Sequence, residues 1–162
     1  MNEPQRLSHA TVEEVASLLV PVVGRQLLVP TVTVAEMVPY REPQRHIDAP
    51  DWYLGDIEWR DQLVPVICYE VMSGEAQPSY SGACRIAVLN GTGISDDLPF
   101  VALATQGIPK LARVKAEEIH EDEDAELKRF DLMGVVHAGE KHIIPNVTAL
   151  EQAFYDYRRT QL

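Results

Sequence analysis

The stretch PDWYLGDIEWRDQLVPVICY, residues 50–69, joins a turn-like beginning and one arginine flanked by carboxylates to a long apolar run. The run at residues 63–69 is rich in Val and Ile, and its length is typical of a β-strand buried on both faces. Pro65 has no backbone N–H to donate, which predicts a position at a sheet edge or a bulge. Gly55 predicts a close approach of the backbone to another segment. The segment around Arg60 is too short and too rich in Asp for a helix, so we expect Arg60 on a turn between two strands.

The composition is that of a folded protein without affinity for polyanions. The chain has 162 residues, of which 24% are charged, and this length allows one domain or two small barrels that share a core. Its formal net charge of -11 argues against nucleic acid and anionic membranes as partners. The N-terminus does not resemble a signal peptide, and no apolar run approaches the ~18 residues that span a bilayer. These features predict a cytoplasmic protein. Cys68 and Cys84 lack metal-site spacing and are expected to be buried small hydrophobic residues.

The rest of the chain is predicted to be rich in β-strands. A first hairpin is expected around Pro21 and Gly24, a second around the turn at residues 90–97, and a third around Gly139. The same order of hairpin, loop and apolar strand recurs in both halves, which favours paired small barrels. Residues 31–37 are expected to be extended or irregular, and residues 111–116 are expected to continue a sheet. Exposed loops are predicted at residues 39–51 and 72–82. The acidic residues 117–124 are expected to be solvated.

One helix is predicted at the end of the chain. Thr148 and Glu151 have the spacing of a capping box, in which each side chain hydrogen-bonds the backbone of the other. Leu150, Phe154 and Tyr157 lie on one face of such a helix, and basic residues at 158–159 suit its C-terminal end.

Catalytic and metal-binding motifs are weak throughout the sequence. Residues 90–93 (NGTG) lack the Lys-Ser/Thr of a phosphate loop and are better explained as a hairpin turn. His137 and His142 can meet across a hairpin but have no third ligand nearby, and His120 in the acidic run is expected to be solvated. We therefore expect no enzyme activity, no cofactor and no metal.

The chain resembles the CheW-like domains, the adaptors of bacterial chemosensory arrays. The resemblance rests on Leu54 and Gly55, on Arg60 at a turn, and on the apolar-Pro-apolar strand at residues 64–66. Upstream, RQLLVPTVTVAEM is similar to a family strand followed by a turn with Val34, Glu36 and Met37. RIAVLN, PFVALATQGI, MGVVHAG and IIPNVTALEQAF follow in the family's order, so that the match extends over about residues 14–154.

Four positions depart from the family pattern. Asp61 replaces the usual glycine after the arginine, Glu58 replaces an asparagine, and Cys68 and Thr105 stand near expected aspartates. Asp61 can adopt a positive φ at modest cost, so the turn is expected to survive. The departures resemble a divergent branch similar to the ChpC-type proteins of type IV pilus chemosensory systems, which act in twitching motility.

The resemblance implies a mainly β fold of two SH3-like five-stranded β-barrels side by side, with a C-terminal helix, in a single domain over residues 1–162. It implies a non-catalytic adaptor that binds the regulatory domain of a CheA-like histidine kinase with one barrel face and the cytoplasmic tip of a chemoreceptor in the groove between the barrels. Such helix-in-groove recognition relies on apolar anchors and a charged pair. The expected protein-binding residues are Val34, Glu36, Met37, Val38, Leu54, Gly55 and Arg60.

Two other readings of these residues stay open. Arg60 can form a simple surface ion pair with Glu58 or Asp61, worth ~0–1 kcal/mol. The aromatic residues Trp52, Tyr53 and Trp59 suit core packing as well as partner contact. The alternative function is a small β-barrel that binds a ligand or acts as a hydrolase through loop carboxylates, which a deep pocket lined by Glu58, Asp61 and His46 would favour.

Overall fold

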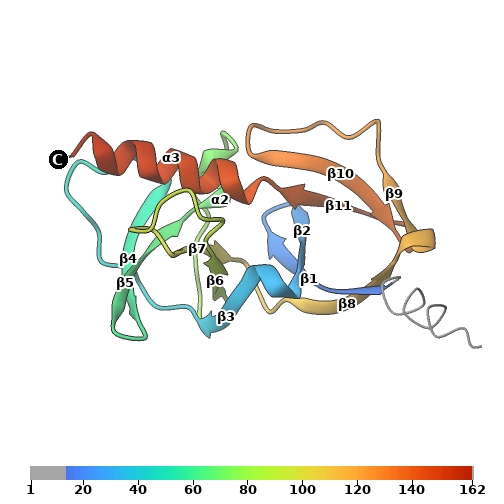
Figure 1. The fold of residues 1–162 in the computed structure, drawn as a ribbon, viewed down its shortest axis with the longest axis horizontal. Helices are drawn as coiled ribbons and strands as arrows, with labels where there is room; N and C mark the ends of the chain where they lie inside the picture. The colour runs from blue at the N-terminus through green and yellow to red at the C-terminus, as the bar shows by residue number, and fades with distance from the viewer. Residues whose placement is uncertain (1–13, 162) are drawn as a thin grey trace, which may run out of the picture.

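Two β-sheets and a C-terminal helix make up the protein in a computed structural model that describes residues 14–161 (Figure 1). This confirms the mainly β fold. The six-stranded sheet has the order β8 (Lys110–Lys115), β1 (Glu14–Val22), β2 (Arg25–Pro30), β11 (Glu140–Pro145), β10 (Asp131–His137) and β9 (Ile119–Glu121). The five-stranded sheet has the order β3 (Val34–Pro39), β6 (Arg85–Asn90), β7 (Phe100–Thr105), β5 (Gln62–Ile67) and β4 (Tyr53–Trp59). The helices are α2 (Tyr69–Met72) and α3 (Val147–Arg159), with short 3-10 turns η1 (Thr31–Thr33) and η2 (Ala116–Glu118).

The two sheets do not correspond to two halves of the sequence. The six-stranded sheet takes strands from both ends of the described chain, and the five-stranded sheet takes the middle. The expectation of five strands in each was wrong for the first sheet, because part of the acidic run forms the short edge strand β9 on β10. Backbone groups pair regardless of side-chain charge, and the exposed side chains of His120 and Glu121 remain in solvent.

The three predicted hairpins are all present. The β1–β2, β6–β7 and β10–β11 pairs are antiparallel. The β10–β11 turn places Ala138 and Gly139 at φ values of 51° and 81°, as a two-residue type I′ turn requires.

The prediction that residues 63–69 form a buried strand is confirmed only for residues 64–67. Residues 64–67 are buried, but Leu63 is 65% exposed, and the strand ends at Ile67 because Tyr69 begins α2. Pro65 is not on an edge strand, since β5 lies between β4 and β7. The registered pairing of β5 with β7 comprises only Val66 and Ile67, and Pro65 precedes it. The opposite residue, Asp56, directs its backbone N–H and C=O to Gln44 instead, so the missing donor of Pro65 costs the β4–β5 ladder nothing.

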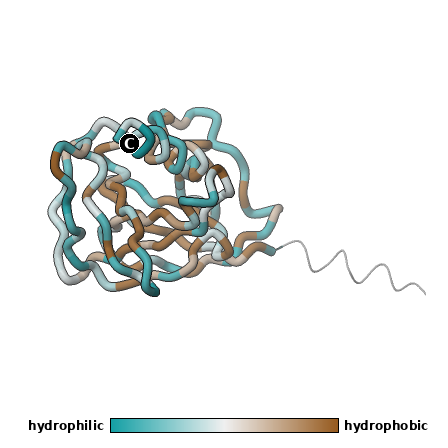
Figure 2. Tube along the Cα trace, turned by 60° about the vertical axis from the view of Figure 1, so that its left-hand side comes forward, coloured by the Kyte–Doolittle hydropathy of each residue, from teal (hydrophilic) through white to brown (hydrophobic). Residues whose placement is uncertain are grey.

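Three apolar clusters form the core. One lies in the six-stranded sheet around Leu28, Val114 and Val135, and a second in the five-stranded sheet around Ile57, Val64 and Ile86. The third joins both sheets to α3 and includes Leu27, Leu103 and Leu150 among its members. Hydrophobic segments accordingly run through the interior in Figure 2. The shared core that the resemblance implies is therefore present.

Helix α3 is capped differently from the prediction. Its N-cap is Asn146, whose side chain accepts a hydrogen bond from the backbone N–H of Ala149 at 3.1 Å. Glu151 is fully buried and accepts hydrogen bonds from the backbone N–H and the hydroxyl of Thr92 in the β6–β7 loop. The capping box was wrong because the helix begins at Val147, so that Thr148 lies inside the first turn and Glu151 is beyond the N3 position. The predicted apolar face is confirmed for Leu150 and Phe154, which are buried.

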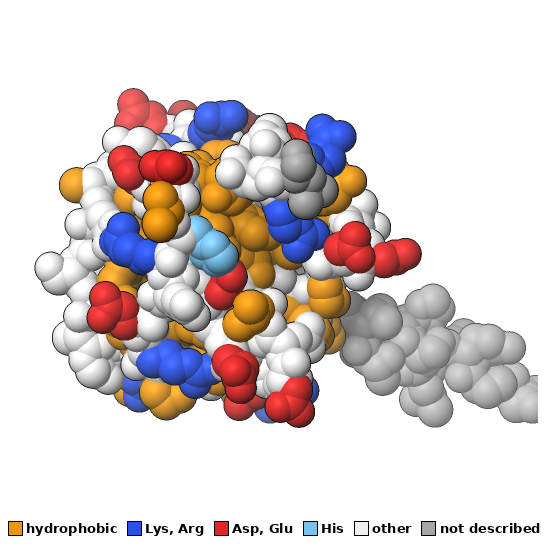
Figure 3. Space-filling view, turned by 90° about the vertical axis from the view of Figure 1, so that its left-hand side faces the viewer, with side chains coloured by type: hydrophobic (Ala, Val, Ile, Leu, Met, Phe, Trp, Pro, Cys, Tyr) orange, Lys and Arg blue, Asp and Glu red, His pale blue; other side chains and the backbone are white. Residues whose placement is uncertain are grey.

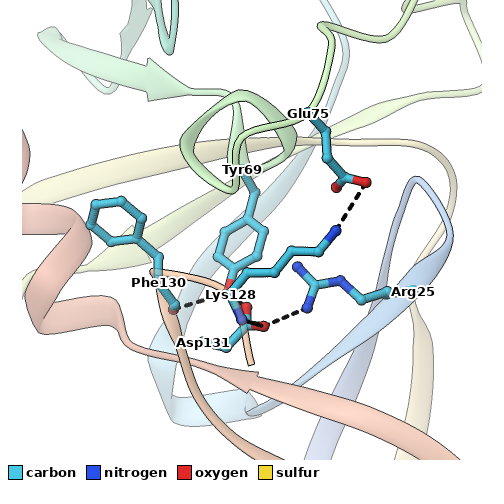
Figure 4. A network of polar contacts seen from close by, with 6 residues as sticks. All are labelled: Arg25, Tyr69, Glu75, Lys128, Phe130 and Asp131. Carbon is cyan, nitrogen blue, oxygen red and sulfur yellow. Dashed lines mark hydrogen bonds and ion pairs between the residues drawn. The ribbon is translucent and has the colours of Figure 1, made fainter. Parts of the chain in front are cut away.

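A polar network ties α2, and through it the five-stranded sheet, to the six-stranded sheet (Figure 4). The Tyr69 hydroxyl donates to Asp131 Oδ1 at 2.6 Å and contacts the Phe130 carbonyl at 2.9 Å, and Arg25 Nη1 donates to Asp131 Oδ2 at 2.5 Å. Burial raises the pKa of Asp131, but hydrogen bonds from Arg25, Tyr69 and the Lys128 amide outweigh it and hold that pKa below its usual value. This network links α2 to β2 and β10, in addition to the apolar cluster that the two sheets share.

Candidate functional site: the β4–β5 turn and strand β3

The β4–β5 hairpin presents Arg60 at its tip, as predicted. Arg60 and Asp61 are the two turn residues, with φ values of 49° and 63°. A type I′ turn needs a positive φ at both positions, which Asn and Gly adopt most easily. The resemblance implied that Asp61 could adopt a positive φ at the family's glycine position; the structure has a positive φ there and at Arg60 as well. A non-glycine pair in this conformation carries backbone strain of the kind that concentrates at functional positions.

Arg60, Glu36 and Trp59 form one contact cluster on the surface. Arg60 Nη2 lies 3.2 Å from Glu36 Oε1, and the same oxygen accepts a hydrogen bond from the Trp59 indole N–H at 2.9 Å. The guanidinium carbon of Arg60 lies 4.5 Å from the centre of the Trp59 ring. The side chains of Arg60 and Glu36 remain 64% and 44% exposed. The ion pair of Arg60 is therefore with Glu36 on β3, and the described residues show none with Glu58 or Asp61.

The predicted apolar anchors separate into two groups. Val34 and Met37 are half-buried and pack against the shared core cluster, at the seam between the two sheets. Val38 and Leu54 are only 6% and 3% exposed and belong to the core of the five-stranded sheet. Their side chains support the site from inside and offer a partner almost no surface.

Two apolar residues that the sequence did not single out are exposed on the six-stranded sheet and just before β3. Val32 is 81% exposed in η1, directly before β3. Leu111 is 63% exposed and lies opposite Leu18, which packs against the shared core, so both residues share that face of the sheet. The alternation of apolar residues in β8 did not reveal this, because both faces of the strand carry them.

Gly55 positions the loop that precedes the hairpin. It has a φ of 126°, and a Cβ at this position would collide with the backbone carbonyl of Gln44. Gln44 and Asp56 exchange two backbone hydrogen bonds of 2.8 and 3.0 Å beside this glycine. The predicted close backbone approach is confirmed, and it holds the otherwise exposed loop at residues 39–51 against β4.

The aromatic residues near the turn are mainly core residues. Tyr53 and Trp59 are 6% and 5% exposed, and Trp59 packs edge-to-face on Phe100 with ring centroids 4.8 Å apart. Trp52 is half-buried against Tyr157. The Tyr53 hydroxyl donates to Asp56 at 2.5 Å, and burial raises the pKa of this tyrosine.

The weak chemical motifs form no reactive centre in the described residues. The Thr92 amide of the NGTG loop is occupied by the Glu151 carboxylate, which takes the place of an external anion. His137 and His142 are buried in the β10–β11 hairpin, and residues 14–161 contain no group of three or more side chains that suits a metal ion. Cys68 and Cys84 are buried and free, as predicted. None of the helices in this part of the chain is long and apolar enough to cross a membrane.

The pocket of the alternative function does not form around its predicted residues. Glu58 and Asp61 line one open hollow, whereas His46 lines a different pocket with Asp56. The predicted carboxylates of Glu58 and Asp61 are thus not brought together with the His46 imidazole in one pocket.

The protein thus has two β-sheets with a shared core, and Arg60 at an exposed hairpin tip pairs with Glu36 on β3. Residues 16–153 match the CheW-like domain family, and the chain belongs to that family, whose domains scaffold other proteins and are not catalytic. The structure is similar to that of a scaffolding protein, TtCheW from Thermoanaerobacter tengcongensis, with a TM-score of 0.69 and 15% sequence identity. That similarity covers 81% of this chain and 88% of the other. No curated protein sequence matches this one.

Proposed function

We propose that this protein is a non-catalytic adaptor that couples a chemoreceptor to a CheA-like histidine kinase in the cytoplasm. The observation that carries the proposal is the exposed Arg60–Glu36 pair at the β4–β5 turn of a family scaffold. The half-buried Val34 and Met37 lie on the same strand as Glu36 and pack against the shared core cluster. A charged pair next to apolar side chains gives an amphipathic helix both burial and register. We assign these four residues to the contact with the helical receptor tip, and a barrel face to the kinase regulatory domain. Val38, Leu54 and Gly55 shape that surface from within.

The strained turn supports a role in binding over a role in stability. An exposed ion pair contributes only ~0–1 kcal/mol, and a non-glycine residue with positive φ costs about as much or more. The Arg60 turn therefore gives little net folding stability. Its position at an exposed tip suits recognition of a carboxylate, for which a guanidinium offers two parallel donors.

Binding of purified receptor cytoplasmic fragments and of the kinase regulatory domain tests this function. Arg60→Glu places two carboxylates together and is expected to weaken binding of one partner about tenfold or more, the effect of a central interface residue. Arg113→Glu is the matched control, because Arg113 pairs with Glu14 at 3.1 Å and is 69% exposed on the other sheet. The control should change affinity less than about twofold. Equal binding by wild type and Arg60→Glu would refute the proposed contact.

We further propose that the partner presents a more basic surface than is usual for this family. Asp61 adds a carboxylate at the turn where the family resemblance implies glycine. Asp61→Gly removes this charge and suits the φ of 63°, so it should keep the fold and reduce the salt dependence of binding. An unchanged salt dependence would remove this part of the proposal.

The system in which the adaptor acts is proposed to be a type IV pilus chemosensory system that controls twitching motility, through a branch similar to the ChpC-type proteins. Support comes from the departures at Glu58, Asp61, Cys68 and Thr105. Cys68 and Thr105 are buried, so their replacement of aspartates removes charge from the interior. Binding to a panel of kinase regulatory domains tests it: preference for a flagellar-type kinase over a pilus-type kinase would contradict the assignment.

A further inference from the structure

A second surface pocket lies at the C-terminal end of α3, away from the seam between the sheets. It is formed by β4, β5, the loop before β7 and the last turns of α3, with a cavity volume of about 370 Å³. We call it the α3 pocket. Figure 3 shows the face that contains it, where hydrophobic side chains line a central hollow bordered by charged residues. Glu36 and Arg60 do not line this pocket.

The bottom of the α3 pocket is formed by buried apolar side chains. Val64, Leu98 and Phe154 contribute to its lining and are 1%, 2% and 4% exposed. Leu63 also lines it but is 65% exposed. An exposed leucine beside an apolar hollow is a surface that gains from being covered, since burial of apolar area drives association.

The polar groups of the pocket are fixed before any ligand arrives. Asp56 accepts hydrogen bonds from Tyr53 at 2.5 Å and from the His46 ring at 2.7 Å, and its side chain is only 14% exposed. Arg158 directs Nη1 to the backbone carbonyl of Asp97 at 3.3 Å and stacks over Phe154. The Asp97 carboxylate has no hydrogen bond or ion pair within residues 14–161, and the residue is exposed.

Charge selects the kind of ligand. Asp56 and Asp97 line the pocket, and Glu58 and Asp61 line an adjoining hollow that shares Gln62 and Leu63 with it. Arg158 is the one Lys or Arg among the residues of both hollows. This excess of carboxylates, on a chain of net charge -11, favours a cation beside an apolar group.

We propose that the α3 pocket is a second protein-docking site, which takes an apolar or aromatic side chain flanked by Lys or Arg from a partner segment. The volume is at the lower end of the ~300–1,000 Å³ typical of ligand pockets, which suits one or two side chains. The pocket is connected to the Arg60 turn, because Phe100 lines it and also packs on Trp59, whose indole N–H holds Glu36. The site does not depend on the proposed adaptor function, and it can be tested on this chain alone.

Titration of the 15N-labelled full chain with short blocked peptides tests the site. The probes are the tripeptides Lys-Phe-Lys, Glu-Phe-Glu and Lys-Gly-Lys. Amide shifts at Leu63, Leu98, Phe100 and Arg158 are expected with Lys-Phe-Lys, at a weak, millimolar affinity. Both other peptides should bind at least about threefold more weakly, since each lacks one of the two features that the pocket recognises.

Surface variants with matched controls separate the site from general charge attraction. Asp97→Lys should weaken binding of Lys-Phe-Lys about two- to fivefold, whereas Asp96→Lys, at the exposed neighbour outside the pocket lining, should not. Leu63→Ser should also weaken it, and Leu132→Ser, at a 56% exposed leucine of the other sheet, should not. All four positions are exposed, so the variants are expected to fold.

Three outcomes would overturn the proposal: equal binding of Lys-Phe-Lys and Glu-Phe-Glu, equal effects of Asp96→Lys and Asp97→Lys, or shifts outside the pocket. Concentration-dependent shifts of the pocket amides without peptide would show that a second copy of the chain is the occupant and would also overturn it. Failure of the adaptor proposal would instead appear only in the receptor and kinase binding of Arg60→Glu.

Discussion

Removal of one hydroxyl, by Tyr69→Phe, tests the polar network that joins the two sheets. Tyr69 is fully buried, and its hydroxyl reaches both Asp131 Oδ1 and the Phe130 carbonyl. A hydrogen bond to a charged group contributes about 1.5–3 kcal/mol, and an unpaired buried acceptor costs about 1–3 kcal/mol. Asp131 keeps Arg25 and the Lys128 amide, so the loss is less than the sum of these terms. We expect a decrease of about 2–4 kcal/mol in the free energy of unfolding.

Urea denaturation followed by tryptophan fluorescence measures this decrease. At about 2–4 °C per kcal/mol for a chain of this size, the melting temperature should fall by about 4–16 °C. Tyr155→Phe is the control, because no hydrogen bond of the Tyr155 hydroxyl is found in the described residues, and it should change stability by less than about 0.5 kcal/mol. A double-mutant cycle with Asp131→Asn should give a coupling energy of about 1 kcal/mol or more. Tyr69→Phe within about 0.5 kcal/mol of wild type would refute the view that this network holds the sheets together.

Three further changes test other contacts. Gly55→Ala should cost at least about 2 kcal/mol of stability in chemical denaturation, because it adds a collision with Gln44 to the strain of a positive φ. Gly24→Ala, at a φ of 76° with free space around it, should cost about 1–2 kcal/mol, and equal costs would disprove the collision. Glu151→Ala should lower the free energy of unfolding by about 2–4 kcal/mol, because the contacts with Thr92 are lost, and Glu151→Gln should lower it less. A decrease for Glu151→Ala no larger than that for Gln152→Ala, at the exposed neighbour, would contradict the attachment of the loop to α3. Burial lowers the pKa of His142 below its usual 6.5, with His137 adding to the effect and Glu140 opposing it, so the unfolded chain binds the proton more tightly. The contribution of the neutral His142 to the free energy of unfolding is therefore present above about pH 6.5 and is lost as the pH falls through the pKa of His142 in the folded protein. Urea midpoints measured across this pH range test it, and an identical pH dependence in wild type and His142→Gln would exclude the contribution.

Local sequence determined the hairpins, the turn at Arg60, the close approach at Gly55 and the position of α3. Each depends on chemistry within a few residues: glycine at positive φ, proline at strand ends, or apolar side chains at the helical period. The resemblance in motif order added the family and the two-barrel expectation, because it compares the whole chain at once.

Only the tertiary structure determined which side chains of distant segments contact one another. Glu36 and Arg60 are separated by 23 residues, and β3 and β4 are the two edges of the five-stranded sheet. Only the curling of that sheet brings the Glu36 and Arg60 side chains to 3.2 Å. In the same way Glu151 hydrogen-bonds a loop that lies 59 residues earlier in the chain, a contact that the local sequence of α3 does not indicate. Side-chain patterns within a strand show which positions are suited to burial, but they do not show which other strand will cover them. That is why Val38 and Leu54 are core residues and Leu63 is an exposed one, although all three have similar apolar side chains.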